Sequence, residues 1–192
     1  MLSAIYCCDR NGVIGYRDTK TCKFFQSIDC PADKKYFAQT TKGKTVIMGG
    51  NTARGLIEEI GGLLPGRAHI VLTRDPALTA QLKQIAEYQS IPCTVITEIQ
   101  GIQNLDGYPE ECFVIGGADL IAQLRDVIST YYVTEFDVAD EFPDHFEPIK
   151  VEVIGSCKDG TVKPGFTRVE CKKFTDFAGD RVIQGYFGKY IA

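Results

Sequence analysis

The chain has 192 residues, a length that fits one domain, so we expect a single domain over residues 1–192. Hydrophobic residues make up 44% of it and its formal net charge is −4, which allows a sizeable core and argues against intrinsic disorder. No block of basic residues favours nucleic acid as a partner, and no apolar run reaches the length of a membrane span. The N-terminus also lacks the charged-then-apolar pattern of a secretory signal, so we expect a cytoplasmic protein.

Predicted strands and helices alternate along the first two thirds of the chain. Short apolar runs rich in β-branched residues predict strands at residues 2–8, 46–48, 68–73, 93–97, 112–115 and 130–136. Helices are predicted between them at residues 30–41, 52–60, 78–88, 99–105 and 118–128. Pro31 suits the first turn of the first helix, and Asn51 or Thr52 is expected to cap the second. This alternation is typical of a parallel sheet with helices on both faces.

Two stretches depart from the alternation. Residues 9–27 are polar and irregular, and a loop of that length in a compact domain is usually functional. Residues 149–154, 167–174 and 181–191 predict strands that add an antiparallel edge to the sheet. The predicted fold is therefore a single-domain α/β protein with a mostly parallel, twisted sheet of about eight strands and a C-terminal antiparallel hairpin.

Two of the predicted strands run directly into paired glycines. The fifth strand ends at Gly116 and Gly117, the second ends at Gly49 and Gly50, and a helix is predicted after each pair. Such strand ends leave bare backbone N–H groups at a helix N-terminus, where anions and cofactors bind. The alternative is that each pair only makes a tight turn. Because there are two such ends, we favour one ligand held between them.

Four polar residues are candidates for ligand binding. Asp33 lies one turn into a predicted helix, where it either complements the helix dipole or, beside Phe37, forms a buried carboxylate with a raised pKa. Arg67 follows a Pro-Gly turn and could clamp a carboxylate, and Arg74 ends a strand and could hold a phosphate. Either arginine could equally be a solvated charge. Thr134 could bond a ligand or only its neighbours.

The eight cysteines do not indicate a metal site or a disulfide framework. Cys7 and Cys8 are adjacent in a predicted strand, so their side chains point to opposite faces. No CxxC spacing and no paired histidines are present, so we expect no metal. We interpret the cysteines as small buried or half-buried thiols in a reducing compartment.

Taken together, these motifs resemble the dihydrofolate reductase family over most of the chain. They occur in the order of the family and at similar spacing. The matching segments are residues 5–7 with 11–15, 31–37, 46–49 with Thr52, 64–67, 70–74, 114–117 and 133–134.

The resemblance implies NADPH-dependent reduction of 7,8-dihydrofolate to 5,6,7,8-tetrahydrofolate by a monomer, in support of one-carbon and thymidylate metabolism. Asp33 and Thr134 would be catalytic: they would hydrogen-bond the pterin and favour protonation of the ring nitrogen next to the carbon that receives hydride. Arg67 would clamp the α-carboxylate of the substrate's glutamate tail. The implied substrate-binding residues are Ile5, Tyr6, Cys7, Asp33, Lys34, Phe37, Leu64, Arg67, Ile115 and Thr134.

For the cofactor, the resemblance implies NADPH. Ile14 and Gly15 would close over the nicotinamide, the two paired-glycine ends would hold the pyrophosphate, and Thr73 and Arg74 would take the adenosine 2′-phosphate. The peptide between the later pair of glycines would be cis. The implied cofactor-binding residues are Cys7, Ile14, Gly15, Gly49, Gly50, Asn51, Thr52, Leu72, Thr73, Arg74, Ile115, Gly116, Gly117, Ala118, Asp119 and Leu120.

The chain also departs from the family pattern. It has no Trp, although the family usually places one shortly before the acid, where Ser27 or Ile28 stands. Gly50 stands where many members have a phosphate-binding arginine, which leaves Arg74 or Arg54 to select NADPH. Two alternatives stay open: a reductase of the same fold for another pteridine or pyrimidine, and a folate- or NADPH-binding protein without catalysis.

Overall fold

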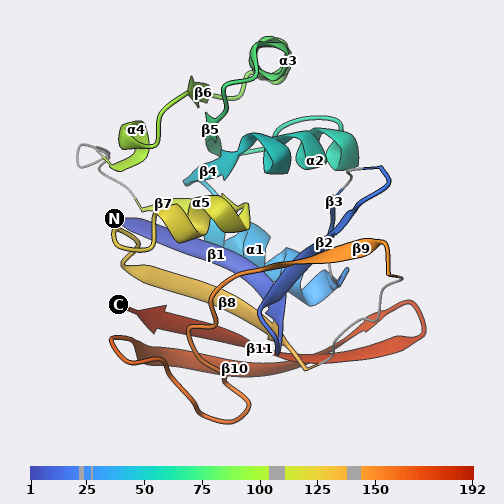
Figure 1. The fold of residues 1–192 in the computed structure, drawn as a ribbon, viewed down its shortest axis with the longest axis vertical. Helices are drawn as coiled ribbons and strands as arrows, with labels where there is room; N and C mark the ends of the chain where they lie inside the picture. Colours follow the sequence, from blue (N-terminus) through green and yellow to red (C-terminus); the bar gives the residue numbers. More distant parts are fainter. Residues whose placement is uncertain (22–23, 27, 104–110, 138–143) are drawn as a thin grey trace. The chain divides into compact units, whose positions relative to one another are not determined.

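The computed structural model describes all residues except 22–23, 27, 104–110 and 138–143. Cys22, Ser27 and the end of the helix expected at residues 99–105 therefore lie outside the described residues. The strands are β1 Leu2–Asp9, β2 Val13–Asp18, β3 Phe24–Gln26, β4 Thr45–Gly49, β5 Ala68–Leu72, β6 Cys93–Ile96, β7 Cys112–Gly116, β8 Thr130–Phe136, β9 Phe146–Lys150, β10 Thr167–Ala178 and β11 Arg181–Ile191. The helices are α1 Pro31–Thr41, α2 Gly50–Ile60, α3 Pro76–Gln89, α4 Gln100–Gln103 and α5 Ala118–Gln123 (Figure 1).

One mixed sheet contains eight of the strands, in the order β10-β11-β8-β1-β7-β4-β5-β6. The pairs β1–β7, β7–β4, β4–β5 and β5–β6 are parallel, whereas β8–β11 and β11–β10 are antiparallel. The predicted sheet of about eight strands and its C-terminal antiparallel hairpin are confirmed.

A second, three-stranded sheet in the order β3-β2-β9 corrects two predictions. The stretch expected to be an irregular loop contains β2 and β3, and β9 pairs with β2 instead of extending the edge of the main sheet. Val13 and Tyr16 of β2 are buried, but polar neighbours interrupt the apolar pattern that would have revealed the strand. One partner strand, β9, lies more than a hundred residues further along the chain, and the other, β3, has only three residues, so the local signal for the pairing was weak.

Two helix boundaries also differ from the predictions. Helix α2 begins at Gly50 with Gly49 as its cap and no side-chain capping bond, so the predicted cap at Asn51 or Thr52 is wrong. Helix α5 ends at Gln123 rather than near residue 128. The turn that follows α5 still buries Leu124, which explains why the apolar spacing continued past the end of the helix.

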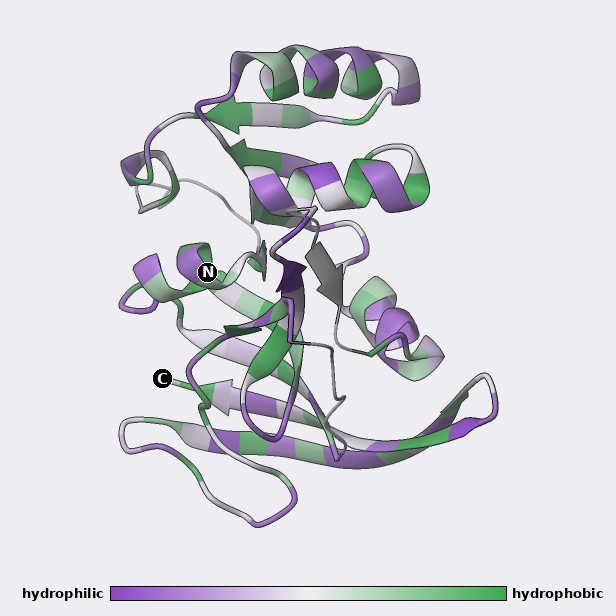
Figure 2. Cartoon of the chain, turned by 45° about the vertical axis from the view of Figure 1, so that its right-hand side comes forward, coloured by the Kyte–Doolittle hydropathy of each residue, from purple (hydrophilic) through white to green (hydrophobic). Residues whose placement is uncertain are grey.

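The chain divides into two compact units, each with its own core. Unit 1 contains residues 1–4 and 39–128, and unit 2 contains residues 5–38 and 129–192. In unit 1 the core joins β4 and β5 to one face of α2 and α3; Figure 2 shows both helices carrying hydrophobic and hydrophilic residues. In unit 2 a core of Ile28, Cys30, Phe136 and Ile183 lies against the start of α1. Within the described residues, no helix has the length and apolar character needed to cross a membrane.

Candidate active site

Asp33 is a buried acid in the first turn of α1, in unit 2. Its side chain is 8% exposed, and this burial raises the pKa of the carboxyl above its usual value. Hydrogen bonds from the side chains of Thr134 and Cys7 act in the opposite direction and partly offset the burial. The structure therefore brings together Asp33, Thr134 from β8 and Cys7 from β1.

A residue that sequence reasoning missed holds the start of α1. Asp176 of β10 accepts a hydrogen bond from the backbone N–H of Ala32 at 2.5 Å and contacts the Sγ of Cys30 at 3.7 Å. The backbone N–H of Phe177, together with these bonds, lowers the pKa of Asp176, because all of them favour the charged carboxylate. Asp176 thus caps the helix that carries Asp33, from a position 144 residues away in the sequence.

The other predicted substrate residues of unit 2 lie on β1 and α1. Ile5 is buried, and burial raises the pKa of Tyr6 well above its usual value. Phe37 is half-buried one turn after Asp33. Lys34, in contrast, is exposed and pairs with Asp29 at 2.9 Å. The side chain of Lys34 therefore forms an ion pair at the protein surface.

The two paired-glycine ends meet in unit 1, as the parallel pairing of β4 and β7 requires. The Gly116–Gly117 peptide is cis, as the family resemblance implied. A β-carbon on Gly116 would lie 3.1 Å from the Oγ1 of Thr52, and one on Gly49 would lie 3.9 Å from the backbone nitrogen of Gly117. The packing at Gly116 thus leaves little room for a side chain, and bare backbone faces the N-terminal turns of α2 and α5.

The remaining predicted cofactor residues lie on or beside α2, α5, β5 and β7 in unit 1 and on β2 in unit 2. Leu72 ends β5, Thr73 follows it directly, and Asn51 lies in the first turn of α2. Ala118, Asp119 and Leu120 form the first turn of α5, where Leu120 is buried. Ile115 is half-buried against the core of unit 1, and Ile14 and Gly15 lie on β2 in unit 2.

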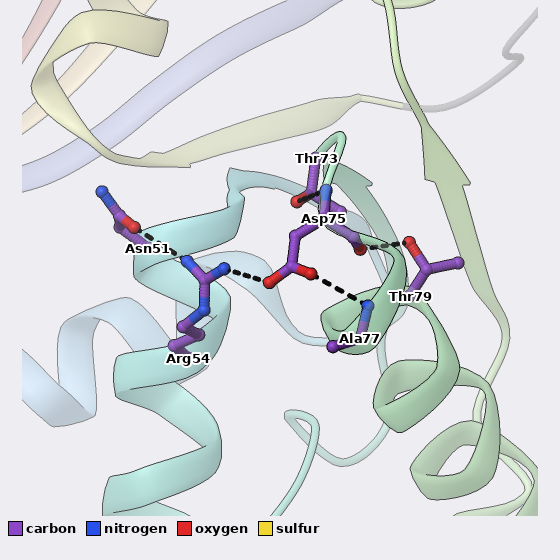
Figure 3. A network of polar contacts seen from close by, with 6 residues as sticks. All are labelled: Asn51, Arg54, Thr73, Asp75, Ala77 and Thr79. Atoms are coloured by element: carbon purple, nitrogen blue, oxygen red, sulfur yellow. Dashed lines mark hydrogen bonds and ion pairs between the residues drawn. The ribbon is translucent and has the colours of Figure 1, made fainter.

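Steric crowding explains the glycine at position 50. A β-carbon there would lie 2.9 Å from the Oγ1 of Thr73. Arg54, one turn further along α2, is held by Asn51 at 2.9 Å and by Asp75 (Figure 3). Asp75 also caps α3, because it accepts from the N–H of Ala77 at 2.9 Å. Arg54 is therefore already bound to a carboxylate that the fold uses.

Arg74 lines a pocket of about 390 Å³ in unit 1. Its guanidinium donates to the carbonyl oxygen of Thr97 at 3.3 Å and lies 3.4 Å from the carboxylate of Glu98. Lys83 of α3 also lines this pocket. Two cations at one open pocket suit an anionic group, but Glu98 competes for the arginine.

Arg67 is fixed by its neighbours in unit 1. Its Nε donates to the Oγ1 of Thr41 at 2.8 Å and its Nη1 donates to the carbonyl of Pro65 at 2.7 Å. The loop before it is anchored by His69, whose Nε2 accepts from the N–H of Leu64 at 3.1 Å. His69 is 1% exposed, and burial lowers its pKa to about 4, so the ring is neutral at pH 7 and can accept this bond. Sequence reasoning gave His69 no such role.

Among the described residues, unit 2 therefore contains a buried acid with two side-chain hydrogen-bond donors. Unit 1 contains the paired-glycine strand ends and the two candidate arginines, Arg67 and Arg74. In the described part of the chain, no cluster of three or more His, Cys, Asp or Glu could hold a metal ion. A buried acid that accepts side-chain hydrogen bonds suits proton transfer. With the α/β fold and the paired-glycine strand ends, it fits the class of oxidoreductases that take a nucleotide cofactor.

Comparison with known proteins narrows this class. A family model described as dihydrofolate reductase matches residues 1–156, so the chain belongs to the dihydrofolate reductase family. The dihydrofolate reductase of Bacillus subtilis (strain 168) is 34% identical over 151 residues, which cover 77% of this chain and 78% of that protein. The dihydrofolate reductase of Lactococcus lactis subsp. lactis is 29% identical over 154 residues, covering 77% and 80%.

A solved structure shares the fold. Dihydrofolate reductase from Enterococcus faecalis, complexed with NADP(H) and RAB-propyl, has a TM-score of 0.69 and 21% identity over 100% of this chain and 95% of that one.

Proposed function

We propose that this protein reduces 7,8-dihydrofolate to 5,6,7,8-tetrahydrofolate with NADPH as the hydride donor. The observation that carries the proposal is the buried carboxylate of Asp33, with side-chain hydrogen bonds from Thr134 and Cys7 and a raised pKa. Membership of the family supports the same activity.

Asp33 has the chemistry that a pterin requires. A carboxylate can accept two parallel N–H bonds from the ring nitrogen and amino group of the pterin. Thr134 would orient this carboxylate, because its hydroxyl already bonds it. Burial moves the pKa of Asp33 towards neutral pH. An acid of this kind can favour protonation of the ring nitrogen beside the carbon that accepts hydride.

The paired-glycine turn of unit 1 fits the cofactor. The pyrophosphate would be held by backbone N–H groups of Gly49, Gly116 and Gly117 and by the hydroxyl of Thr52. A β-carbon at Gly116 would crowd Thr52, so this position favours glycine. Arg74 would take the 2′-phosphate. NADPH, when bound, supplies the hydride. The protein's own contribution is to orient both rings and exclude water.

The test is the loss of 340 nm absorbance when protein, NADPH and dihydrofolate are mixed. Asp33→Asn should lower the rate of hydride transfer at pH 7 about 100-fold or more and leave the Kd for NADPH unchanged. Asp180→Asn, the same change at an exposed acid in the turn between β10 and β11, is the matched control and should retain activity. No absorbance change with either NADPH or NADH would contradict the proposal, and equal losses of rate and NADPH binding in Asp33→Asn would make Asp33 structural.

Arg67 separates folate from the pteridine and pyrimidine substrates that carry ribose phosphate. Its guanidinium is fixed by Thr41 and Pro65, which suits a bidentate clamp on a carboxylate. Arg67→Ala should raise the KM for dihydrofolate about 10- to 100-fold, since a charge-assisted bidentate pair contributes about 1.5–3 kcal/mol. An unchanged KM would favour the other substrates, and a protein that binds both ligands without turnover would be a binding protein.

The remaining predictions from the sequence are still predictions. We infer one functional domain over residues 1–192, a monomer, a cytoplasmic location and a place in one-carbon and thymidylate metabolism. The family supports the last of these, and gel filtration of the purified chain tests the monomer.

A further inference from the structure

Two cysteines meet on one face of the β10–β11 hairpin in unit 2. Cys171 of β10 is the direct partner of Gly188 in β11, so the β-carbon positions of the two residues face the same side of the sheet, about 5 Å apart. A β-carbon on Gly188 would lie 3.2 Å from the Sγ of Cys157. The sulfur of Cys157 therefore occupies the space above Gly188, beside the side chain of Cys171.

The segment that carries Cys157 is held onto this face by several bonds. Glu135 of β8 accepts from the N–H of Cys157 at 2.8 Å and from the Oγ of Ser156 at 2.6 Å. Arg168 donates to the carbonyl of Ser156 at 2.9 Å. The hydroxyl of Tyr190, two residues beyond Gly188 and hence on the same face, lies 3.6 Å from the Sγ of Cys157. The thiol is thus fixed opposite Cys171 rather than free to move over the surface.

The two thiols differ in how well an oxidant can reach them. Among the cysteines that the structure describes, Cys171 is the only exposed one, and Cys157 is half-buried. Burial raises the pKa of Cys157 to about 12, and its interaction with the thiol of Cys171 adds to this rise. At neutral pH Cys157 therefore stays protonated, and Cys171 is the thiol that an oxidant reaches first.

We propose that Cys157 and Cys171, free thiols in the structure, form a reversible disulfide when a peroxide oxidises the protein. The Cys171 thiolate attacks one peroxide oxygen and breaks the O–O bond, which gives a sulfenic acid and hydroxide, and the hydroxide takes up the proton released when Cys171 ionised to form one water. The sulfur of Cys157 then attacks the sulfenyl sulfur, and the displaced hydroxide leaves as a second water with the Cys157 proton. Two thiols are oxidised and one peroxide is reduced to two waters. Neither cysteine contacts Asp33, so this site is independent of the proposed reductase activity.

The disulfide should stabilise unit 2. It closes a loop of roughly 15 residues and ties the segment bonded to Glu135 to the edge strand β10, so the Tm of the full chain should rise by about 5–10 °C. Because Cys157 must lose its proton to attack, disulfide closure should also speed up as the pH rises from 7 to 9.

The experiment uses the reduced full-length protein, hydrogen peroxide, and mass spectrometry of unreduced tryptic peptides. A loss of about 2 Da and one cross-linked peptide pair containing Cys157 and Cys171 are expected, together with a Tm rise that dithiothreitol reverses. Cys157→Ser and Cys171→Ser should each lose the cross-link and the Tm rise. Cys93→Ser, which removes a half-buried thiol of unit 1, is the matched control and should keep both.

Two results would overturn the inference. One is a cross-link that joins either cysteine to a different partner in the wild-type protein. The other is oxidised wild-type protein in which Cys157 still reacts with iodoacetamide after unfolding while Cys171 is sulfinic acid. Both are read from the wild-type chain, so they do not depend on how well a variant folds.

Discussion

The buried histidine behind the Arg67 loop should make the protein lose stability at mildly acidic pH. His69 is neutral in the folded chain because burial lowers its pKa from 6.5 to about 4, and its Nε2 accepts the N–H of Leu64. A protonated ring cannot accept that bond. Between pH 6.5 and about 4 the unfolded chain therefore binds more protons at this residue than the folded chain, so stability falls as the pH falls through this window.

The size of the effect follows from the two pKa values. At pH 5 the unfolded histidine is almost fully protonated while the folded one is mostly neutral, which removes about 2 kcal/mol of stability relative to pH 7. His69→Gln keeps an acceptor for Leu64 and cannot titrate. The difference between the unfolding free energies of wild type and variant should therefore shrink or reverse by about 2 kcal/mol from pH 7 to pH 5.

Urea unfolding followed by circular dichroism at pH 7, 6 and 5 measures this difference, since the chain has no Trp to report by fluorescence. Asp33, whose raised pKa changes stability in the opposite sense, is present in both proteins and cancels. Parallel stability curves for wild type and His69→Gln would show that the ring is not held neutral, and would remove His69 as the anchor of the loop.

Two further predictions concern the ligand-binding residues. Cys7→Ala removes a donor to the Asp33 carboxylate, so the apparent pKa in the pH profile of kcat/KM should rise; an unmoved profile would show that the weak S–H bond has no effect. Glu98→Gln removes the carboxylate that holds Arg74, so the Kd for NADPH should fall about 2- to 5-fold at low salt while that for NADH stays constant. Equal changes for both cofactors would exclude a contact between Arg74 and the 2′-phosphate.

The parts of the fold that could be read from the sequence are those that local patterns encode. The parallel strands are short apolar runs, so their order along the chain and the C-terminal antiparallel hairpin were predicted, while the cis peptide followed only from the family resemblance. Strand β2 was missed because its mixed pattern forms a strand only through pairing with the three-residue β3 and with β9, far along the chain. The cap that Asp176 provides for α1 and the bond from Leu64 to His69 depend on tertiary contacts, for which the sequence contains no spacing signal.

Arg54 and Arg74 are the two candidates for the arginine that selects the cofactor, and each would have to give up its present carboxylate partner to bind a phosphate. Arg54 binds Asp75, and Asp75 caps α3, so withdrawing Arg54 would disturb a carboxylate on which a helix depends. Arg74 binds Glu98 at 3.4 Å with both side chains mostly exposed, and a surface pair of this kind contributes only about 0–1 kcal/mol. A phosphate, with more charge and more acceptor oxygens than a carboxylate, can displace such a partner. We therefore expect Arg74 to exchange Glu98 for the 2′-phosphate, with Lys83 beside it, while Arg54 keeps its place in the fold.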